Sequence, residues 1–250
     1  MLESIHKITN SSIKFVELDL KNSVKTKEFV SSNKEIDGVI HFAASKAVGE
    51  SVESPLKYYT NNLFSLTNLL NELKNLNKEI NFIFSSSATV YGDPKILPIT
   101  ESEPIKKAES PYGNTKQIGE EIIKDLVNSS SNFNAISLRY FNPIGAHPSA
   151  LIGELPIGIP QNLVPYITQT AIGKRNELTV FGDNYLTRDG SCIRDYIHVV
   201  DLAKAHIKSL EKLIKESSKN YYDAFNIGTG KGTSVLELIS CFESVSGKKL

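Results

Sequence analysis

The run NFIFS at Asn81 to Ser85, followed at once by Ser86 and Ser87, is a short apolar segment that ends in hydroxyl side chains. Similar β-rich runs occur at Ile13 to Leu18 (IKFVEL), Gly38 to Phe42 (GVIHF) and Ala135 to Phe141 (AISLRYF). Longer segments of helical period separate them, a pattern typical of a parallel sheet with crossover helices. We therefore predict an α/β fold, with the serines at the carboxyl edge of the sheet, where such folds bind ligands.

Two helices are predicted between these strands. Pro55 to Asn77 repeats Leu and Phe at spacings of three and four, and the segment after Pro111 carries one apolar stripe. Ser110 directly before Pro111 is an N-cap followed by a first-turn proline, so the second helix has a well-marked start. The stripe consists of Ile118, Ile122 and Leu126.

The character of the chain changes after Phe141. The segment Asn142 to Pro160 is rich in Pro and Gly and has little periodicity. Two later helices are predicted, at Val199 to Leu213 and at Ser234 to Glu243. The first is expected to bury one side, made of Ala203, Ile207 and Leu210. We expect a sheet domain over residues 1–141 and a second region over 142–250 from which some segments return to the sheet.

The composition narrows the class of protein. The chain has 250 residues, with 28 basic and 28 acidic side chains and a net charge of zero, which argues against nucleic acid and anionic membranes as partners. No apolar run approaches the roughly 20 residues of a membrane span, and Glu3, His6 and Lys7 stand where a signal peptide would be apolar. Two distant cysteines, Cys192 and Cys241, fit a reducing compartment. We expect a cytoplasmic enzyme or binding protein.

Tyr112 and Lys116 give the strongest chemical signal. Four residues apart on a helix, they share a face, so the ammonium can lie near the phenol and lower its pKa toward 7. Such a phenol is a competent general base for a sugar hydroxyl. The spacing alone is weak evidence, because the same pair recurs at Tyr91 and Lys95. There, Gly92 and the residues after it favour a turn, so that pair is expected to be accidental.

The glycine-rich segment Asn226 to Gly232 (NIGTGKG) invites a phosphate-binding interpretation but fits neither known pattern. Gly232 stands where a P-loop has Ser or Thr, and Thr233 occupies the third glycine position of GxGxxG. We predict a tight turn before a helix instead. A dinucleotide-binding glycine loop, expected near the start of the chain, is absent from the sequence.

The remaining candidates are histidines and one arginine. The five histidines show no metal-ligand spacing, so no metal site is expected, and His198 and His206 are interpreted as structural. Arg194 could form a bidentate contact with a phosphate, with the neighbouring Asp195 orienting its guanidinium. A purely structural pair between Arg194 and Asp195 is an equally good interpretation.

With Ser87, Tyr112 and Lys116 in place, nearly the whole chain resembles the extended short-chain dehydrogenase/reductase superfamily, and within it the UDP-glucose 4-epimerase family. The resemblance implies an NAD-dependent isomerase of galactose metabolism. It implies a Rossmann-like doubly wound parallel sheet with a smaller substrate-binding region. The matching stretches are FAASKAVGESVES (Phe42 to Ser54), FIFSSSATVYGD (Phe82 to Asp93), SPYGNTK (Ser110 to Lys116), RYFNPIGAHPS (Arg139 to Ser149) and VFGDNYLTRDGSCIRDYIHVVD (Val180 to Asp201).

The resemblance also implies roles for individual residues. Tyr112 would be the catalytic base, Lys116 would hold the ribose and tune Tyr112, and Ser87 would hydrogen-bond the sugar hydroxyl being oxidised. These three would touch NAD, together with Asp19, Leu20, Phe42, Ala43, Ala44, Ser45, Lys46, Asn61 and Phe141. UDP-glucose or UDP-galactose would be held by Ser87, Tyr112, Asn142, Asn162, Leu163, Thr179, Val180, Phe181 and Arg194.

The implied reaction passes through a 4-keto sugar. Tyr112 removes the C4 hydroxyl proton while hydride moves to tightly bound NAD, and the sugar then turns and receives the hydride on its other face. Anchoring must therefore come mostly from the nucleotide diphosphate, which fits the implied role of Arg194.

Two parts of the family pattern are missing from this sequence. Met1 stands where a family member would already have passed its first strands and glycine loop, a βαβ unit of roughly 30 or more residues. Leu250 precedes the family's later arginine-bearing segment. We therefore expect a sheet without its first strands, with Ile13 to Leu18 separated from the remaining strands, and an incomplete substrate region. We also expect the chain by itself to bind NAD weakly or not at all and to have little activity.

Three functions stay open at this stage. The leading one is a UDP-glucose 4-epimerase, whose complete form the resemblance implies to be a homodimer. A related sugar-nucleotide epimerase or dehydratase is the second, although a dehydratase would be expected to carry acidic residues beside the serine run. A non-catalytic remnant is the third; intact Ser87, Tyr112 and Lys116 argue against it, and the missing glycine loop argues for it.

Overall fold

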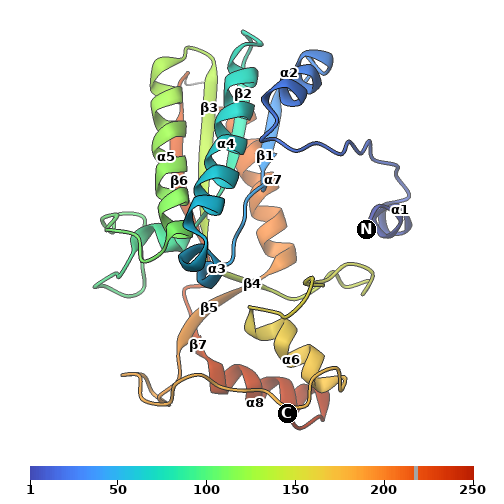
Figure 1. The fold of residues 1–250 in the computed structure, drawn as a ribbon, viewed down its shortest axis with the longest axis vertical. Helices are drawn as coiled ribbons and strands as arrows, with labels where there is room; N and C mark the ends of the chain where they lie inside the picture. Colours follow the sequence, from blue (N-terminus) through green and yellow to red (C-terminus); the bar gives the residue numbers. More distant parts are fainter. Residues whose placement is uncertain (217–218) are drawn as a thin grey trace. The chain divides into compact units, whose positions relative to one another are not determined.

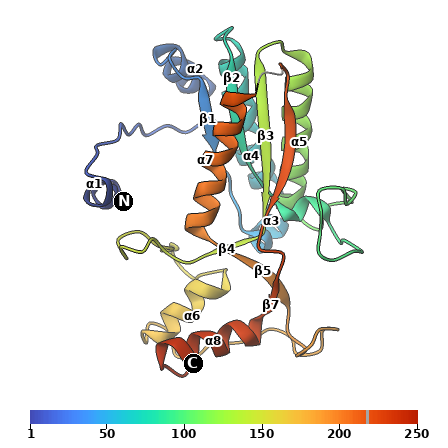
Figure 2. The same cartoon turned by 180° about the vertical axis from the view of Figure 1, so that it is seen from behind.

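The computed structural model describes residues 1–216 and 219–250. They form two compact units. The sheet unit comprises Lys14–Tyr140 and Ala203–Ile227, and the second unit comprises Met1–Ile13, Phe141–Leu202 and Gly228–Leu250. Figures 1 and 2 show the elements of both from opposite sides. The functions expected of the two parts of the chain stay predictions.

A parallel sheet forms the centre of the sheet unit. Its strand order is β1-β2-β3-β6, with β1 at Gly38–His41, β2 at Ile80–Ser87, β3 at Phe133–Tyr140 and β6 at Tyr222–Ile227. Every neighbouring pair is parallel, so the carboxyl ends of all four strands lie at one edge. The strands predicted around residues 38, 81 and 135 are confirmed, within a few residues at each end. β6, from the later part of the chain, is the fourth strand of this order.

Helices cover both faces of this sheet, as a parallel sheet requires. Phe82 and Phe84 pack with Leu66 of α4 (Pro55–Lys74) and with α5 (Pro111–Ser129), whereas Ile83 between them packs with Leu213 of α7 (Val199–Lys215). This is the alternation of successive side chains in a strand. α4 and α5 lie in front of the sheet in Figure 1, and α7 lies in front of it in Figure 2. The remaining elements of the unit are α2 (Ser23–Ser32), α3 (Val48–Glu53) and the 3₁₀ helix η1 (Ala88–Tyr91).

The second unit is built on three short strands. β5 (Ile193–His198) pairs in parallel with β4 (Asn142–Ile144) and antiparallel with β7 (Gly232–Ser234). Its helices are α1 (Leu2–Thr9), α6 (Leu163–Ala171) and α8 (Val235–Ser246). The segment Asn142 to Pro160, rich in Pro and Gly, contains β4 and otherwise neither helix nor strand. The turn predicted at Asn226 to Gly232 is also confirmed, although it leads into β7 before the helix begins.

The predicted helix starts are capped as expected. Ser110 accepts a hydrogen bond from the backbone N–H of Gly113, with Pro111 in the first turn of α5. Ser234 and Glu237 form a reciprocal capping box at the start of α8, where the sequence predicted a helix from Ser234. Among the described residues, no helix is long and apolar enough to cross a membrane.

The strand predicted at Ile13 to Leu18 is wrong. All six residues are described, and none belongs to a strand. Phe15 is 65% exposed and Val16 45%. β-structure needs a hydrogen-bonded neighbour, and an extended run without one gains nothing from its propensity.

The buried side predicted for α7 is wrong as well. Ala203 and Ile207 are exposed, Ile207 by 52%. Leu213 and His206 are buried instead, and they lie two turns apart on the face that the sheet covers. Leu210 is the one predicted member that packs on the sheet, where its side chain would be 3.2 Å from a Cβ on Gly38 of β1.

Candidate active site

Ser87, Tyr112 and Lys116 lie together in the sheet unit. Ser87 is the last residue of β2, and the first turns of α5 carry Tyr112 and Lys116. All three are buried, with exposed fractions of 8%, 9% and 5%. The Ser110 cap fixes where α5 begins, and therefore fixes which residues of this helix lie beside the end of β2. The structure thus places these three residues at one edge of the sheet. Tyr112 and Lys116 are one helical turn apart, and both are at least 25 positions from Ser87 in the sequence.

The predicted lowering of the Tyr112 pKa is wrong for this structure. Burial raises the pKa of Tyr112 to about 12, and the nearby Tyr140 adds to the rise. A hydrogen bond with Ser87 acts in the opposite direction but does not outweigh burial. The ammonium nitrogen of Lys116 is 5.8 Å from the centroid of the Tyr112 ring. The spacing of the pair does give a shared face, but burial of the phenol dominates its ionisation.

The ammonium group of Lys116 is hydrogen-bonded to the backbone. Its Nζ donates a 2.6 Å hydrogen bond to the carbonyl oxygen of Ser85 and lies 4.9 Å above the ring centroid of Phe84. Burial lowers the pKa of Lys116 to about 8, while the carboxylate of Glu120 acts to raise it. His41, at the end of β1, is held neutral because burial, with a contribution from Lys116, lowers its pKa to about 4.

Glu120 and Arg139 form a buried ion pair that the sequence did not reveal. Arg139 donates to both carboxylate oxygens, with Nη2 at 2.6 Å from Oε2. Both residues are buried, Glu120 with 3% and Arg139 with 7% of its surface exposed. Glu120 also accepts from the hydroxyl of Ser86 at 2.5 Å. The carboxylate therefore joins α5 to β2 and β3 one helical turn beyond Lys116. No local signal in the sequence marks Glu120 as buried, because polar residues within helices are usually exposed.

Tyr91 has a structural role, as its turn-forming context indicated. It ends η1, and Gly92 follows with a positive φ of 64°. Its hydroxyl donates to Asn226 at 2.7 Å and accepts from Arg139 at 3.0 Å. Lys95 lies beyond the helical turn. The second YxxxK pair is therefore accidental.

The loop after β1 carries a run of the predicted cofactor residues, Phe42 to Lys46. Phe42 is 58% exposed, with its ring centroid 4.6 Å from that of His206. Ser45 is fixed by α4: its hydroxyl accepts from Asn61 at 3.2 Å, and its backbone N–H donates to Asn62 at 2.8 Å. Ala43 and Lys46 are exposed and Ala44 is half-buried. Sequence reasoning missed Asn62, which is 6% exposed.

Asp19 and Leu20 precede α2. The Asp19 carboxylate accepts from the backbone N–H of Lys21 at 3.0 Å, and the Leu20 carbonyl accepts from Asn68 of α4 at 2.9 Å. Lys21 and the first turns of α4 line an open cavity of about 330 Å³. Its lining includes the predicted cofactor residue Asn61, and Lys21 directly follows Leu20. Its lining consists of Lys21, Leu56, Lys57, Thr60 and Asn61.

The other predicted residues lie in the second unit. Asn142 begins β4 and Leu163 begins α6. Asn162 precedes α6 at the N-cap position but makes no side-chain capping bond, and its amide donates to Glu154 at 2.9 Å. Thr179, Val180 and Phe181 lie in a loop, with Phe181 84% exposed. Phe141 packs where a Cβ on Gly228 would be 2.8 Å from its ring.

The expected pairing of Arg194 with Asp195 is wrong. Arg194 donates to the carbonyl of Ile193 at 2.7 Å. Asp195 instead accepts from the backbone N–H groups of Thr229 and Gly230, at 2.9 Å and 2.8 Å. Neighbouring side chains on a strand point to opposite faces, so the two residues of β5 reach different partners. The carboxylate of Asp195 thereby occupies the backbone N–H groups with which the glycine-rich turn could otherwise bind an anion.

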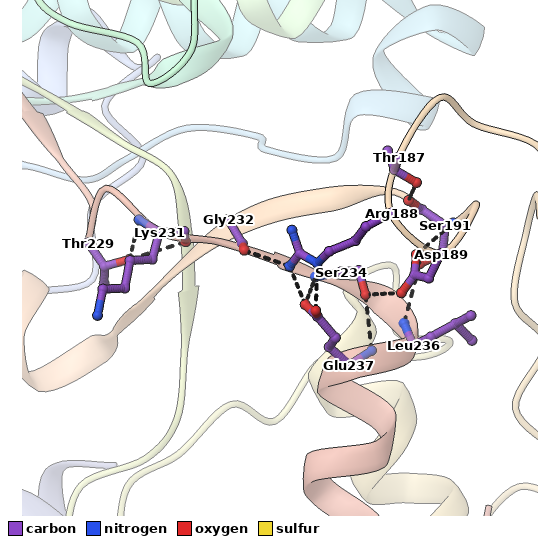
Figure 3. A network of polar contacts seen from close by, with 10 residues as sticks. All are labelled: Thr187, Arg188, Asp189, Ser191, Thr229, Lys231, Gly232, Ser234, Leu236 and Glu237. Atoms are coloured by element: carbon purple, nitrogen blue, oxygen red, sulfur yellow. Dashed lines mark hydrogen bonds and ion pairs between the residues drawn. The ribbon is translucent and has the colours of Figure 1, made fainter.

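A polar network holds the loop that precedes Arg194 (Figure 3). The guanidinium of Arg188 pairs with Glu237 and donates to the carbonyl of Gly232 at 2.9 Å. Asp189 accepts from the hydroxyl of Ser234 and, at 3.0 Å, from the backbone N–H of Ser191. The pairing with Arg188 lowers the pKa of Glu237 to about 2. Loop, β7 and the first turn of α8 are thereby tied together.

Comparisons with known proteins place this geometry in context. A sequence model of the NAD dependent epimerase/dehydratase family matches residues 2–228. The chain is 48% identical over 249 residues to a UDP-glucose 4-epimerase of Drosophila melanogaster, covering 100% of this chain and 70% of the relative. A UDP-glucose 4-epimerase of Bacillus subtilis (strain 168) is 49% identical over 249 residues, with 100% and 72% covered. The solved structure of UDP-glucose 4-epimerase from Bifidobacterium longum in complex with NAD+ and UDP superimposes with a TM-score of 0.92 at 46% identity, covering 99% of this chain and 72% of that one. This likeness confirms the predicted Rossmann-like sheet.

Proposed function

Because the chain belongs to the NAD dependent epimerase/dehydratase family, we propose that it carries the catalytic residues of a UDP-glucose 4-epimerase, an NAD-dependent isomerase that interconverts UDP-galactose and UDP-glucose. The observation that carries the proposal is the buried cluster of Ser87, Tyr112 and Lys116 at the carboxyl edge of the sheet. Relatives close to half identical over the entire chain carry this activity in their names.

The residues of the sheet unit suit a dinucleotide. The loop Phe42 to Lys46 is pinned through Ser45, which leaves Phe42 and Ala43 exposed beside it. Asn61 and Lys116 offer an amide and an ammonium to ribose hydroxyls. We propose that these residues, with Asp19, Leu20 and Phe141, hold NAD, which supplies a hydride acceptor and donor for sugar C4.

In the proposed reaction, the phenol oxygen of Tyr112 takes the proton of the C4 hydroxyl and later returns it. Ser87 hydrogen-bonds the same hydroxyl and orients it toward Tyr112. A phenol with a pKa of about 12 is a poor base at neutral pH, so positive charge must come nearer to it in the working complex than the Lys116 ammonium is here. On the substrate side, Asn142, Asn162, Leu163, Thr179, Val180, Phe181 and Arg194 are proposed to hold the uridine diphosphate.

A chimera tests this function directly. The chain replaces the 249 matching residues of the Bacillus subtilis relative, whose remaining residues stay in place. The purified chimera is incubated with UDP-galactose and NAD, and products are separated by chromatography. UDP-glucose is the expected product. A folded, NAD-bound chimera that yields no UDP-glucose, or that yields a dehydrated 4-keto sugar, contradicts the proposal.

Three broader features are proposed along with this activity. The enzyme acts in galactose metabolism, in the cytoplasm, and as a homodimer. The free cysteines Cys192 and Cys241 support a reducing compartment. The homodimer is proposed for the complete enzyme, so light scattering coupled to size-exclusion chromatography of the chimera tests it, and a dimer requires twice the mass of one chimeric chain.

A further inference from the structure

Asn62 is a buried amide of α4 to which neither the sequence nor the proposed reaction gives a role. Its Oδ1 accepts from the backbone N–H of Ser45 at 2.8 Å, and its Nδ2 donates to the carbonyl oxygen of the same residue at 3.0 Å. One side chain therefore satisfies both backbone groups of Ser45, as a neighbouring strand would. Ser45 lies within the loop Phe42 to Lys46 that follows β1.

The same amide also reaches α5. Its Nδ2 donates to the hydroxyl of Thr115 at 3.0 Å, and that hydroxyl donates to the carbonyl oxygen of Tyr112 at 2.8 Å. Asn62 and Thr115 are 6% and 2% exposed, so water does not compete for these bonds. An amide nitrogen has two hydrogens, which lets it serve Ser45 and Thr115 together. A continuous chain of hydrogen bonds thus runs from the loop to the turn that bears Tyr112.

The neighbouring Asn61 strengthens the contact on the loop side. Its Nδ2 donates to the hydroxyl of Ser45 and to Oδ1 of Asn62, both at 3.2 Å. A buried polar network of this kind fixes geometry when every member has a partner, and is costly when one partner is removed. If position 62 only had to fill space, an apolar side chain would pack there as well as Asn62 does.

We propose that Asn62 is a positioning residue that holds the loop Phe42 to Lys46 in register with the turn of α5 bearing Tyr112, acting through Ser45 and Thr115. This inference deepens the proposed function: with NAD on the loop, the register sets how the cofactor meets the phenol, and displacements of about 1 Å matter for such reactions. The link itself is a property of the chain and does not depend on any ligand.

Hydrogen exchange of the whole chain without ligand tests the link. Asn62→Asp keeps the size and an acceptor for the Ser45 N–H but removes both donors. We expect the Ser45 amide to exchange at least tenfold faster in this variant. Thr115→Val removes the hydroxyl at nearly constant shape and should accelerate the same amide at least threefold, whereas Thr115→Ser retains the hydroxyl and should stay within twofold of the parent.

The double variant Asn62→Asp, Thr115→Val decides whether the residues act as one chain. Its acceleration should be smaller than the product of the two single effects, because the second change removes a bond already lost. Amides of Leu69 and Leu73, farther along α4, should stay within twofold of the parent in all variants. Three results would overturn the proposal. They are single effects on the exchange rate that multiply in the double variant, an equal acceleration of all α4 amides, or a Thr115→Ser variant that behaves like Thr115→Val.

NAD affinity provides the readout that connects the link to the site. By calorimetry, Asn62→Asp placed in the chimera should bind NAD at least fivefold more weakly, and Thr115→Ser should bind like the parent chimera. Unchanged NAD affinity in Asn62→Asp contradicts the positioning role. If the parent chimera itself fails to bind NAD while the exchange results hold, the proposed function fails and the register between loop and α5 stands.

Discussion

The ammonium of Lys116 donates a 2.6 Å hydrogen bond to the carbonyl oxygen of Ser85, two residues before Ser87. This bond fixes the first turns of α5 against the end of β2. It also directs the charge to the backbone, so the ammonium in this structure does not offset the burial of the Tyr112 phenol. The proposed role of Tyr112 as a base therefore requires a positive charge near its phenol, and the chain holds a buried ammonium whose pKa of about 8 lies near neutrality.

Lys116→Met should raise the free energy of unfolding at pH 7 by about 1 to 3 kcal/mol, because it removes a charge that burial disfavours. Burial lowers the folded-state pKa of Lys116 from 10.5 to about 8, so between these values the unfolded chain binds more protons. The parent therefore gains stability as pH rises through this window and lacks that contribution below pH 8. Urea unfolding of both proteins should show that the variant exceeds the parent in free energy of unfolding by less at pH 9.5 than at pH 7. An equal difference at both pH values contradicts the assigned pKa.

Gly119 is expected to resist substitution although it lies inside α5. A Cβ there would be 2.8 Å from the ring of Phe84 and 3.3 Å from Leu66, so Gly119→Ala should destabilise the chain by about 1 to 3 kcal/mol. Gly49 in α3 has open space around its Cβ position, and Gly49→Ala should stabilise by up to about 1 kcal/mol. Chemical denaturation of both variants measures the contrast. Similar effects of the two changes would show that α5 can move away from the sheet.

Glu120→Gln should lower the free energy of unfolding by about 3 to 5 kcal/mol, because it leaves the buried guanidinium of Arg139 without its counter-charge. The matched control is Glu211→Gln, which breaks an exposed ion pair with Lys208 and should change stability by no more than about 1 kcal/mol. Both are measured by urea unfolding. Equal small effects would mean that the Arg139 charge reaches water.

Ser234→Ala should weaken the second unit at the start of α8. The change removes the cap on Glu237 N–H and the bond to Asp189, and a lost cap costs about 1 kcal/mol. Ser240→Ala, on an exposed face of the same helix, should be neutral or slightly stabilising. Amide exchange along α8 checks the pair: faster exchange in the first turn is expected for Ser234→Ala only.

The sequence predicted those parts of the fold that local pattern determines. β1, β2, β3, α4 and α5 were all foreseen, because apolar period, Ser110 and Pro111 mark them within short windows. The run Ile13 to Leu18 has equal β-propensity and forms no strand among the described residues, since a strand depends on a neighbour that lies elsewhere in the chain. The face of α7 was mispredicted for a related reason: the sheet selects which stripe is buried.

Of the candidate site, the sequence identified the residue types and their clustering but not their bonds. Ser45 is 17 positions from Asn62 and Thr115 is 53. Polar residues within helices are usually exposed, so nothing in a local window marks Asn62 or Glu120 as buried. The Tyr112 pKa was mispredicted because spacing reveals a shared helix face, whereas ionisation follows burial and the actual partner of Lys116.

The central claim is that Tyr112 is the base of an epimerase. The most direct test is the turnover of UDP-galactose by Tyr112 variants of the chimera with the Bacillus subtilis relative. Tyr112→Phe should lower kcat for UDP-galactose by about 10²- to 10⁴-fold with little change in the Kd for UDP. Tyr91→Phe, at the accidental YxxxK pair, should retain kcat within a few-fold. A Tyr112→Phe chimera that turns over at the rate of its parent would remove Tyr112 from the mechanism and contradict the account.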